Sequence, residues 1–130
     1  MAFVLSKSVT YKWPVILEMP VDGGRFKKER FTVIFRRLPQ SRIDEILLLG
    51  QKLRRVAQEG MPETEDLLSE VRVTLREMIA GWEGVKQSDD DLDDLEFTEE
   101  NLSAFLDFQG VGGAILEAFG ESLQLSKAKN

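Results

Sequence analysis

The chain contains no cysteine and no histidine among its 130 residues. Without cysteine it has no disulfide, no thiolate zinc site and no cysteine nucleophile. Without histidine it lacks the usual general base at neutral pH, the usual partner of a catalytic serine and the commonest metal ligand. Carboxylate chemistry remains possible, but the spacing of the acidic residues suggests no catalytic pair. We therefore expect a protein that is not an enzyme and takes no cofactor, metal ion or small-molecule substrate.

Long apolar runs are also absent. No stretch approaches the roughly 20 apolar residues that a membrane-spanning helix needs. The first residues, Met1 to Lys7, lack a basic region followed by an apolar one, so we expect no signal peptide and a cytoplasmic protein. The length and a hydrophobic content of 42% fit one domain, residues 1–130, with a real core.

The charge is acidic overall and unevenly placed. A net charge of −6 argues against a nucleic-acid partner, which would need clustered Lys and Arg. Basic residues gather over 25–37, and acidic residues gather over 86–100. The two segments could pair within one chain or between copies through self-association, or both could be solvated surface.

The acidic run 89–96 has two sharper interpretations. Asp89, Asp91, Asp93 and Glu100 have the spacing of ligands in a calcium-binding EF-hand loop, but the glycine required at the sixth position is Asp94. A loop that mimics DNA would have to hold its charges rigidly, whereas so many neighbouring acids repel one another. A solvated loop explains the run better.

The first third of the sequence predicts a β-hairpin over residues 1–38. Apolar and polar residues alternate from Val9 to Met19 and again from Phe31 to Phe35, which is the period of a half-buried strand. Residues 20–24 form the turn, and Pro14 places the first strand at a sheet edge or at a bulge. Residues 3–5 could supply a short third strand.

Residues 40–125 predict about four helices, which makes the fold class α+β. The first helix opens at Ser41, with Asp44 completing a capping box, and carries Gly50 where another backbone would approach closely. The second starts at Pro62 and runs through Trp82. Thr98 caps a short third helix. A last helix leads to a loose tail over residues 126–130.

Some aromatic and apolar residues are candidates for binding another protein. Trp82 is either a core anchor or a binding hot spot. Trp13 either packs under the helices or helps a strand edge to recruit another chain. The C-terminal helices offer an apolar groove or simply fill the core, through Phe105, Phe108, Ile115 and Phe119.

The order of these features resembles a known family. The features that carry the resemblance are Trp13, Pro20 to Gly24, Phe31 to Leu38 and Ser41, followed by Gly81-Trp82-Glu83-Gly84-Val85, by Phe97-Thr98 to Leu102, and by Lys129-Asn130. In this order they resemble the tail assembly chaperones of siphovirus-type bacteriophages and prophages over nearly the whole chain. The family loop carries a glycine before its Phe-Thr element, whereas this chain has none between Gly84 and Gly110.

The resemblance implies a non-enzymatic role in building a long phage tail. Such a chaperone binds the tape measure protein, keeps it soluble, helps to deliver tail tube subunits in the host cytoplasm, and is absent from the mature virion. Many of these phages also make a longer product by ribosomal frameshifting. The family has no catalytic residues, so the matching positions are expected to determine the fold.

Two other functions remain open from the sequence. One is a structural tail-completion or head–tail joining subunit that stays in the virion and assembles through the strand edge at Pro14. The other is an acidic regulator of a host protein, whose binding would depend strongly on salt.

Overall fold

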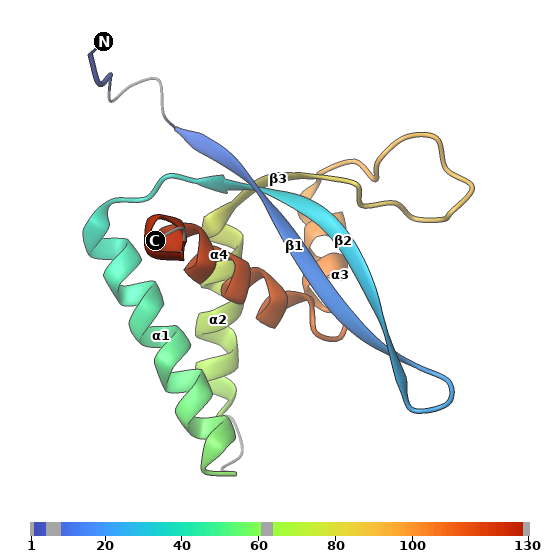
Figure 1. Cartoon of the computed structure of the whole chain (residues 1–130), viewed down its shortest axis with the longest axis horizontal. Coiled ribbons are helices and arrows are strands. Elements are labelled where there is room, and N and C mark those ends of the chain that lie inside the picture. The colour runs from blue at the N-terminus through green and yellow to red at the C-terminus, as the bar shows by residue number, and fades with distance from the viewer. Residues whose placement is uncertain (1, 5–8, 61–63, 129–130) are drawn as a thin grey trace.

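The computed structural model describes residues 2–4, 9–60 and 64–128, without the side chains of 125–128. It contains a three-stranded antiparallel sheet in the order β1-β2-β3 and four helices, so the predicted α+β class is confirmed (Figure 1). In chain order the elements are β1 (Thr10–Val21), β2 (Arg25–Arg36), α1 (Gln40–Gln58), α2 (Glu65–Met78), β3 (Ile79–Glu83), α3 (Glu99–Leu106) and α4 (Val111–Ala128).

The predicted hairpin is confirmed. Its strands pair without interruption from Thr10 opposite Arg36 to Val21 opposite Arg25, and Gly23 and Gly24 supply the positive φ angles of the turn. Burial alternates along β1 as far as Met19 and along β2 from Glu29 to Phe35, as the period-two pattern predicts. β1 lies at the edge of the sheet, where the missing N–H of Pro14 removes no bond from a central ladder.

The third strand comes from a different segment than predicted. Residues 3 and 4 form no strand, and residue 5 lies outside the described residues. Instead, the second helix ends at Met78, and the chain continues as β3 beside β2, so the prediction of a helix through Trp82 was wrong. Gly81 pairs with Ile34, whose Cδ1 atom would lie only 3.2 Å from an added Cβ, and this fit favours the strand.

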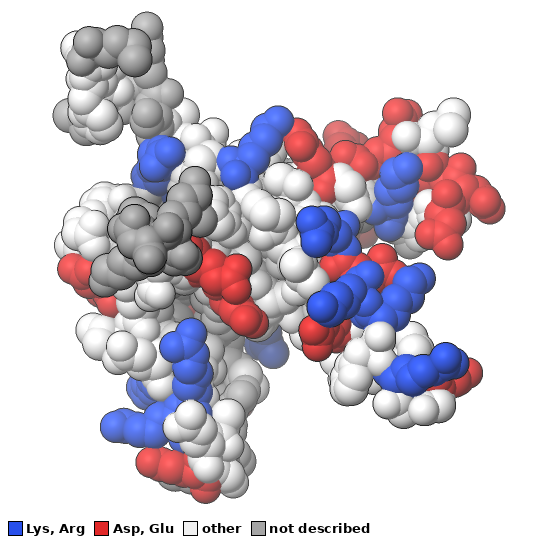
Figure 2. Space-filling model, viewed as in Figure 1, with Lys and Arg blue, Asp and Glu red and all other residues white. Residues whose placement is uncertain are grey.

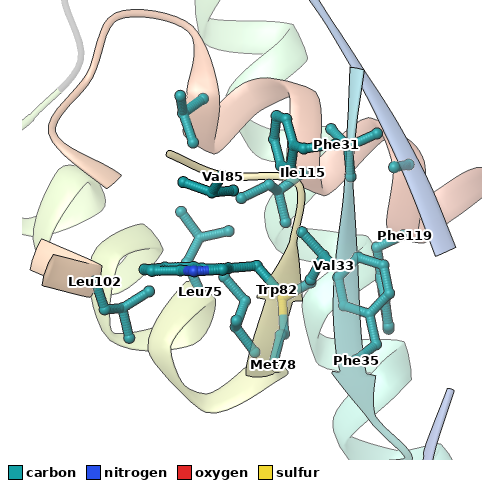
Figure 3. Close-up of a cluster of buried hydrophobic side chains, with 14 of the residues drawn as sticks. Phe31, Val33, Phe35, Leu75, Met78, Trp82, Val85, Leu102, Ile115 and Phe119 are labelled. Atoms are coloured by element: carbon teal, nitrogen blue, oxygen red, sulfur yellow. The ribbon is translucent and has the colours of Figure 1, made fainter. Parts of the chain in front are cut away.

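The helices cover one face of the sheet. α4 runs alongside β1 and α2 lies behind it, as Figure 1 shows, and Phe119 contacts Phe35 edge-on at 5.4 Å between ring centroids. α1 lies beside α2, where Arg42 donates to Glu77 at 2.8 Å and to the buried Thr74 hydroxyl at 3.3 Å. Figure 3 shows the resulting core, which includes Phe31, Val33, Phe35, Leu75, Met78, Trp82, Leu102, Ile115 and Phe119.

Of the two side-chain helix caps that the sequence predicted, at Ser41 and at Thr98, one is confirmed. Thr98 caps α3, because its hydroxyl accepts from the backbone N–H of Asn101 at 3.1 Å. The predicted box at Ser41 was wrong: α1 begins at Gln40 after Pro39, with no side-chain cap, and the Gln40 amide donates to Asp44.

The other helix ends also differ from the expectation. Pro62 lies outside the described residues, and α2 starts at Glu65, capped by the Thr64 hydroxyl. α4 continues through the predicted loose segment as far as Ala128, since Lys and Ala are good helix formers.

Among the described helices, none is long and apolar enough to cross a membrane.

The burial pattern generates a stability prediction. Replacing the fully buried Phe35 by alanine should lower the free energy of unfolding by about 3–5 kcal/mol, because it leaves a cavity against Phe119. The same change at Phe3, which is 81% exposed, should cost no more than about 0.5 kcal/mol. Urea unfolding of both variants measures the difference, and equal losses would contradict the assigned core.

Candidate binding surfaces

The Gly-Trp-Glu-Gly-Val segment, residues 81–85, holds three parts of the fold together. The buried Trp82 indole N–H donates to the carbonyl oxygen of Leu95 at 2.8 Å. Its ring contacts Phe97 and Phe105 edge-on, at 4.9 and 5.0 Å between centroids. This arrangement, which we call the Trp82 clasp, joins β3, the end of the acidic loop and α3. Trp82 therefore occupies the core, one of the two roles that the sequence left open.

The neighbouring motif residues complete this clasp. Gly84 has a φ angle of +79°, which lets the chain turn out of β3. The carbonyl of Val85 accepts from the backbone N–H of Leu95 at 2.6 Å and closes the loop at its base. Phe97 packs on Trp82, and Thr98 starts α3 directly afterwards. Each motif position thus has a structural role in this chain.

The residues predicted to form a C-terminal groove do not share a surface. Ile115 and Phe119 are buried in the core, because the apolar stripe of α4 faces the sheet. Phe105 is half-buried between Phe31 and Trp82, whereas Phe108 is 49% exposed beyond the end of α3. Among the described residues these side chains do not make a continuous groove, and Ile115 and Phe119 fill the core, the other role that the sequence left open.

Trp13 is half-buried on the inner face of β1. It lies between two shallow depressions in the surface, one along β1 and α4 and one toward Leu38 and Leu123. The structure therefore places Trp13 partly under the helices, with part of the side chain near the strand edge.

A groove that the sequence analysis missed lies between α1 and α4. α1 contributes Leu47 and Leu53 to it, and α4 contributes Leu116, and the charged residues Arg54 and Glu117 also line it. Its lining includes three glycines, Gly50, Gly113 and Gly120, which we call its glycine floor.

The glycine floor has no partner within the described chain. A Cβ atom added at any of the three positions would meet no atom within 4 Å. Within this chain, the prediction that another backbone approaches Gly50 is therefore wrong. We call the depression between α1 and α4 the glycine groove. The signal for it in the sequence is three glycines inside helical patterns, where each costs about 1 kcal/mol relative to alanine.

Two charged projections extend from the side of the molecule opposite α1 (Figures 1 and 2). One is the distal hairpin, residues 18–30, which we call the arm; the other is the acidic loop, residues 86–96. Of the ion pairs in the described residues, none joins the arm to the loop. Glu29 raises the pKa of Lys27 through a hydrogen bond and its charge, and the field of Asp89 adds to the increase.

The acidic loop has internal order but no metal-binding cluster in the part of the chain that is described. Lys86 donates to the carbonyl of Asp91 at 3.0 Å, and a carboxylate oxygen of Asp91 accepts from the backbone N–H of Ser88 at 3.1 Å. Within residues 2–4, 9–60 and 64–128, no three acidic side chains converge as a metal ion would require.

Comparisons with protein-family models, with curated proteins and with solved structures find no match to this chain.

The open glycine floor generates a second stability prediction. Replacing Gly50 by alanine should raise the free energy of unfolding by about 1 kcal/mol, because alanine favours the helix and fits the open space. The same change at Gly110 should lower it by about 1–2 kcal/mol, since Gly110 has a φ of +84° and Leu17 lies 3.1 Å from the added Cβ. Urea denaturation checks both, and a destabilised Gly50→Ala variant would show that this glycine is needed for folding.

Proposed function

We propose that this protein is a non-enzymatic tail assembly chaperone and that its glycine groove holds amphipathic helices of a tape measure protein. The observation that carries the proposal is the groove itself: three helical glycines line it, and a Cβ atom added at any of them would meet no atom within 4 Å. Glycine lets a partner backbone approach closely, and Leu47, Leu53 and Leu116 supply apolar contacts. The resemblance of the ordered motifs to tail assembly chaperones indicates the kind of partner, a tape measure protein.

The shape and charge of the protein suit reversible binding. A shallow groove gives modest affinity for each helical segment, so many copies along a long partner would hold it soluble and still release it as the tube forms. The net charge of −6 disfavours aggregation of the complex. The same proposal has the protein work in the host cytoplasm, assist delivery of tail tube protein, and leave before the virion is complete.

The proposal is tested by filling the groove. Gly50→Gln places a flexible polar side chain on the floor, where its Cβ atom meets no atom within 4 Å, so the protein should fold but lose its hold on the partner. We expect the cognate tape measure protein to be soluble when it is co-expressed with the native chain and to precipitate with the variant. Sedimentation of the lysate, followed by quantification of the soluble partner, measures this.

The matched control is Ala104→Gln, which makes the same kind of enlargement at an exposed position of α3, away from the groove. It should keep the partner soluble as well as the native chain does. Equal protection by the Gly50 and Ala104 variants would show that helices are not held in the groove. If even the native chain gives no protection, the chaperone function itself is wrong.

The free edge of β1 favours a second candidate, a structural tail-completion or head–tail joining subunit. β1 pairs on one side only, and its twelve residues leave an edge where another strand could add. Mass spectrometry of purified virions distinguishes the two functions. We expect the chain to be missing from virions if it is a chaperone, and its presence at stoichiometric levels would favour the structural subunit.

A further inference from the structure

The arm is a two-stranded ribbon without a third strand to support it. β3 pairs with residues 32–35 of β2 and stops, so among the described residues no strand pairs with the β2 side of the hairpin beyond Phe31. Two large apolar residues are exposed there: Phe26 at 68% and Val21 at 41%. Exposed apolar side chains inside a charged surface are typical of contact sites between proteins.

The β2 strand of the arm is basic and the acidic loop has the opposite charge. Over residues 25–30 the strand carries Arg25, Lys27, Lys28 and Arg30 against Glu29, while the acidic residues Glu18 and Asp22 lie on the β1 side and in the turn. The loop carries five aspartates and Glu96 against Lys86, and Leu92 at its tip is 96% exposed. Each projection thus has an exposed apolar residue beside charges that are mostly of one sign, basic along the β2 strand of the arm and acidic in the loop.

Direct pairing of two arms edge to edge is disfavoured. If the free edge of one β2 strand met the same edge of another in an antiparallel register centred on the arm, Arg25 would lie opposite Arg30 and Lys27 opposite Lys28. Like charges directly opposite each other destabilise a sheet, and lysines on an edge commonly prevent such pairing. The acidic loop is the surface of opposite charge that a second copy can offer.

We infer that two copies associate around a two-fold axis, with the arm of each seated on the acidic loop of the other. A two-fold interface needs a surface that is complementary to itself, and one chain carrying both signs side by side meets that condition. Phe26 and Leu92 would be the apolar centre of each contact, within a rim of opposite charges. The inference does not depend on the chaperone function.

Charge reversal tests the arrangement. One variant carries Lys27→Glu with Lys28→Glu in the arm; the other carries lysine in place of Asp89, Asp90, Asp93 and Asp94 in the loop, which makes the loop basic and leaves the internally bonded Asp91 intact. All six side chains are exposed, so both variants should fold. In a two-fold dimer of either variant alone, the arm and the loop that meet at each of the two contacts have the same sign of charge and repel each other. In a dimer of one variant with the other, the arm and the loop have opposite signs at both contacts and attract each other.

Analytical ultracentrifugation measures the result. The native chain should be dimeric at about 0.1 M salt and shift toward monomer at about 1 M, where the Debye length falls from about 10 Å to about 3 Å. Each reversed variant should be monomeric, and the mixture should recover the dimer as a heterodimer. A control with Lys52→Glu and Arg72→Glu changes the net charge as the arm variant does, at exposed positions elsewhere, and should remain dimeric.

Four results would overturn the inference. A native chain that stays monomeric at low salt excludes the dimer, and pairing of arm and loop within one chain would give that result. A dimer that survives the reversals is held by other surfaces. Larger assemblies, or a mixture that stays monomeric, are incompatible with a two-fold exchange.

Discussion

The fold depends on the contacts of one side chain, Trp82. Its ring fills the space between β3 and α3, and its indole N–H satisfies the carbonyl of Leu95, which would otherwise be left unpaired beside the core. β3 has only five residues, yet it supplies the third strand that a hairpin needs to form a stable sheet. By fixing β3 and the base of the acidic loop together, the clasp allows the inner face of the sheet to be closed by α2, α3 and α4.

The sequence predicted those elements whose signals are local. The alternation along β1 and β2 and the cap at Thr98 each depend on residues near one another in the chain, so the pattern alone identifies them. β3 was missed for the opposite reason. Ile79 and Trp82 continue the helical spacing of α2, and the strand wins because Gly81 fits against Ile34, a residue 47 positions earlier. A pattern within one segment contains no information about that distant contact.

Local patterns could not identify the glycine groove either. The apolar stripe of α4 was visible in the sequence, but its spacing does not say whether Ile115 and Phe119 face a core or a partner, and packing against the sheet decides for the core. The glycine groove needs α1 and α4 side by side, although their residues lie more than fifty positions apart. What the sequence did contain was glycines at helical positions, where they weaken the helix. The structure adds that a Cβ atom at these positions would meet no atom within 4 Å.

The groove and the charged projections lie at different ends of the molecule. α1, which forms one wall of the groove, is on the side opposite the arm and the acidic loop (Figure 1). Two copies joined by contacts between the arm of one and the acidic loop of the other would therefore leave both grooves free. A long helical partner that engages one groove would then meet the second at high effective concentration, so that two weak contacts hold it far longer than one. Self-association of this kind offers a way for a small protein with a shallow groove to retain a long chain and still release it segment by segment.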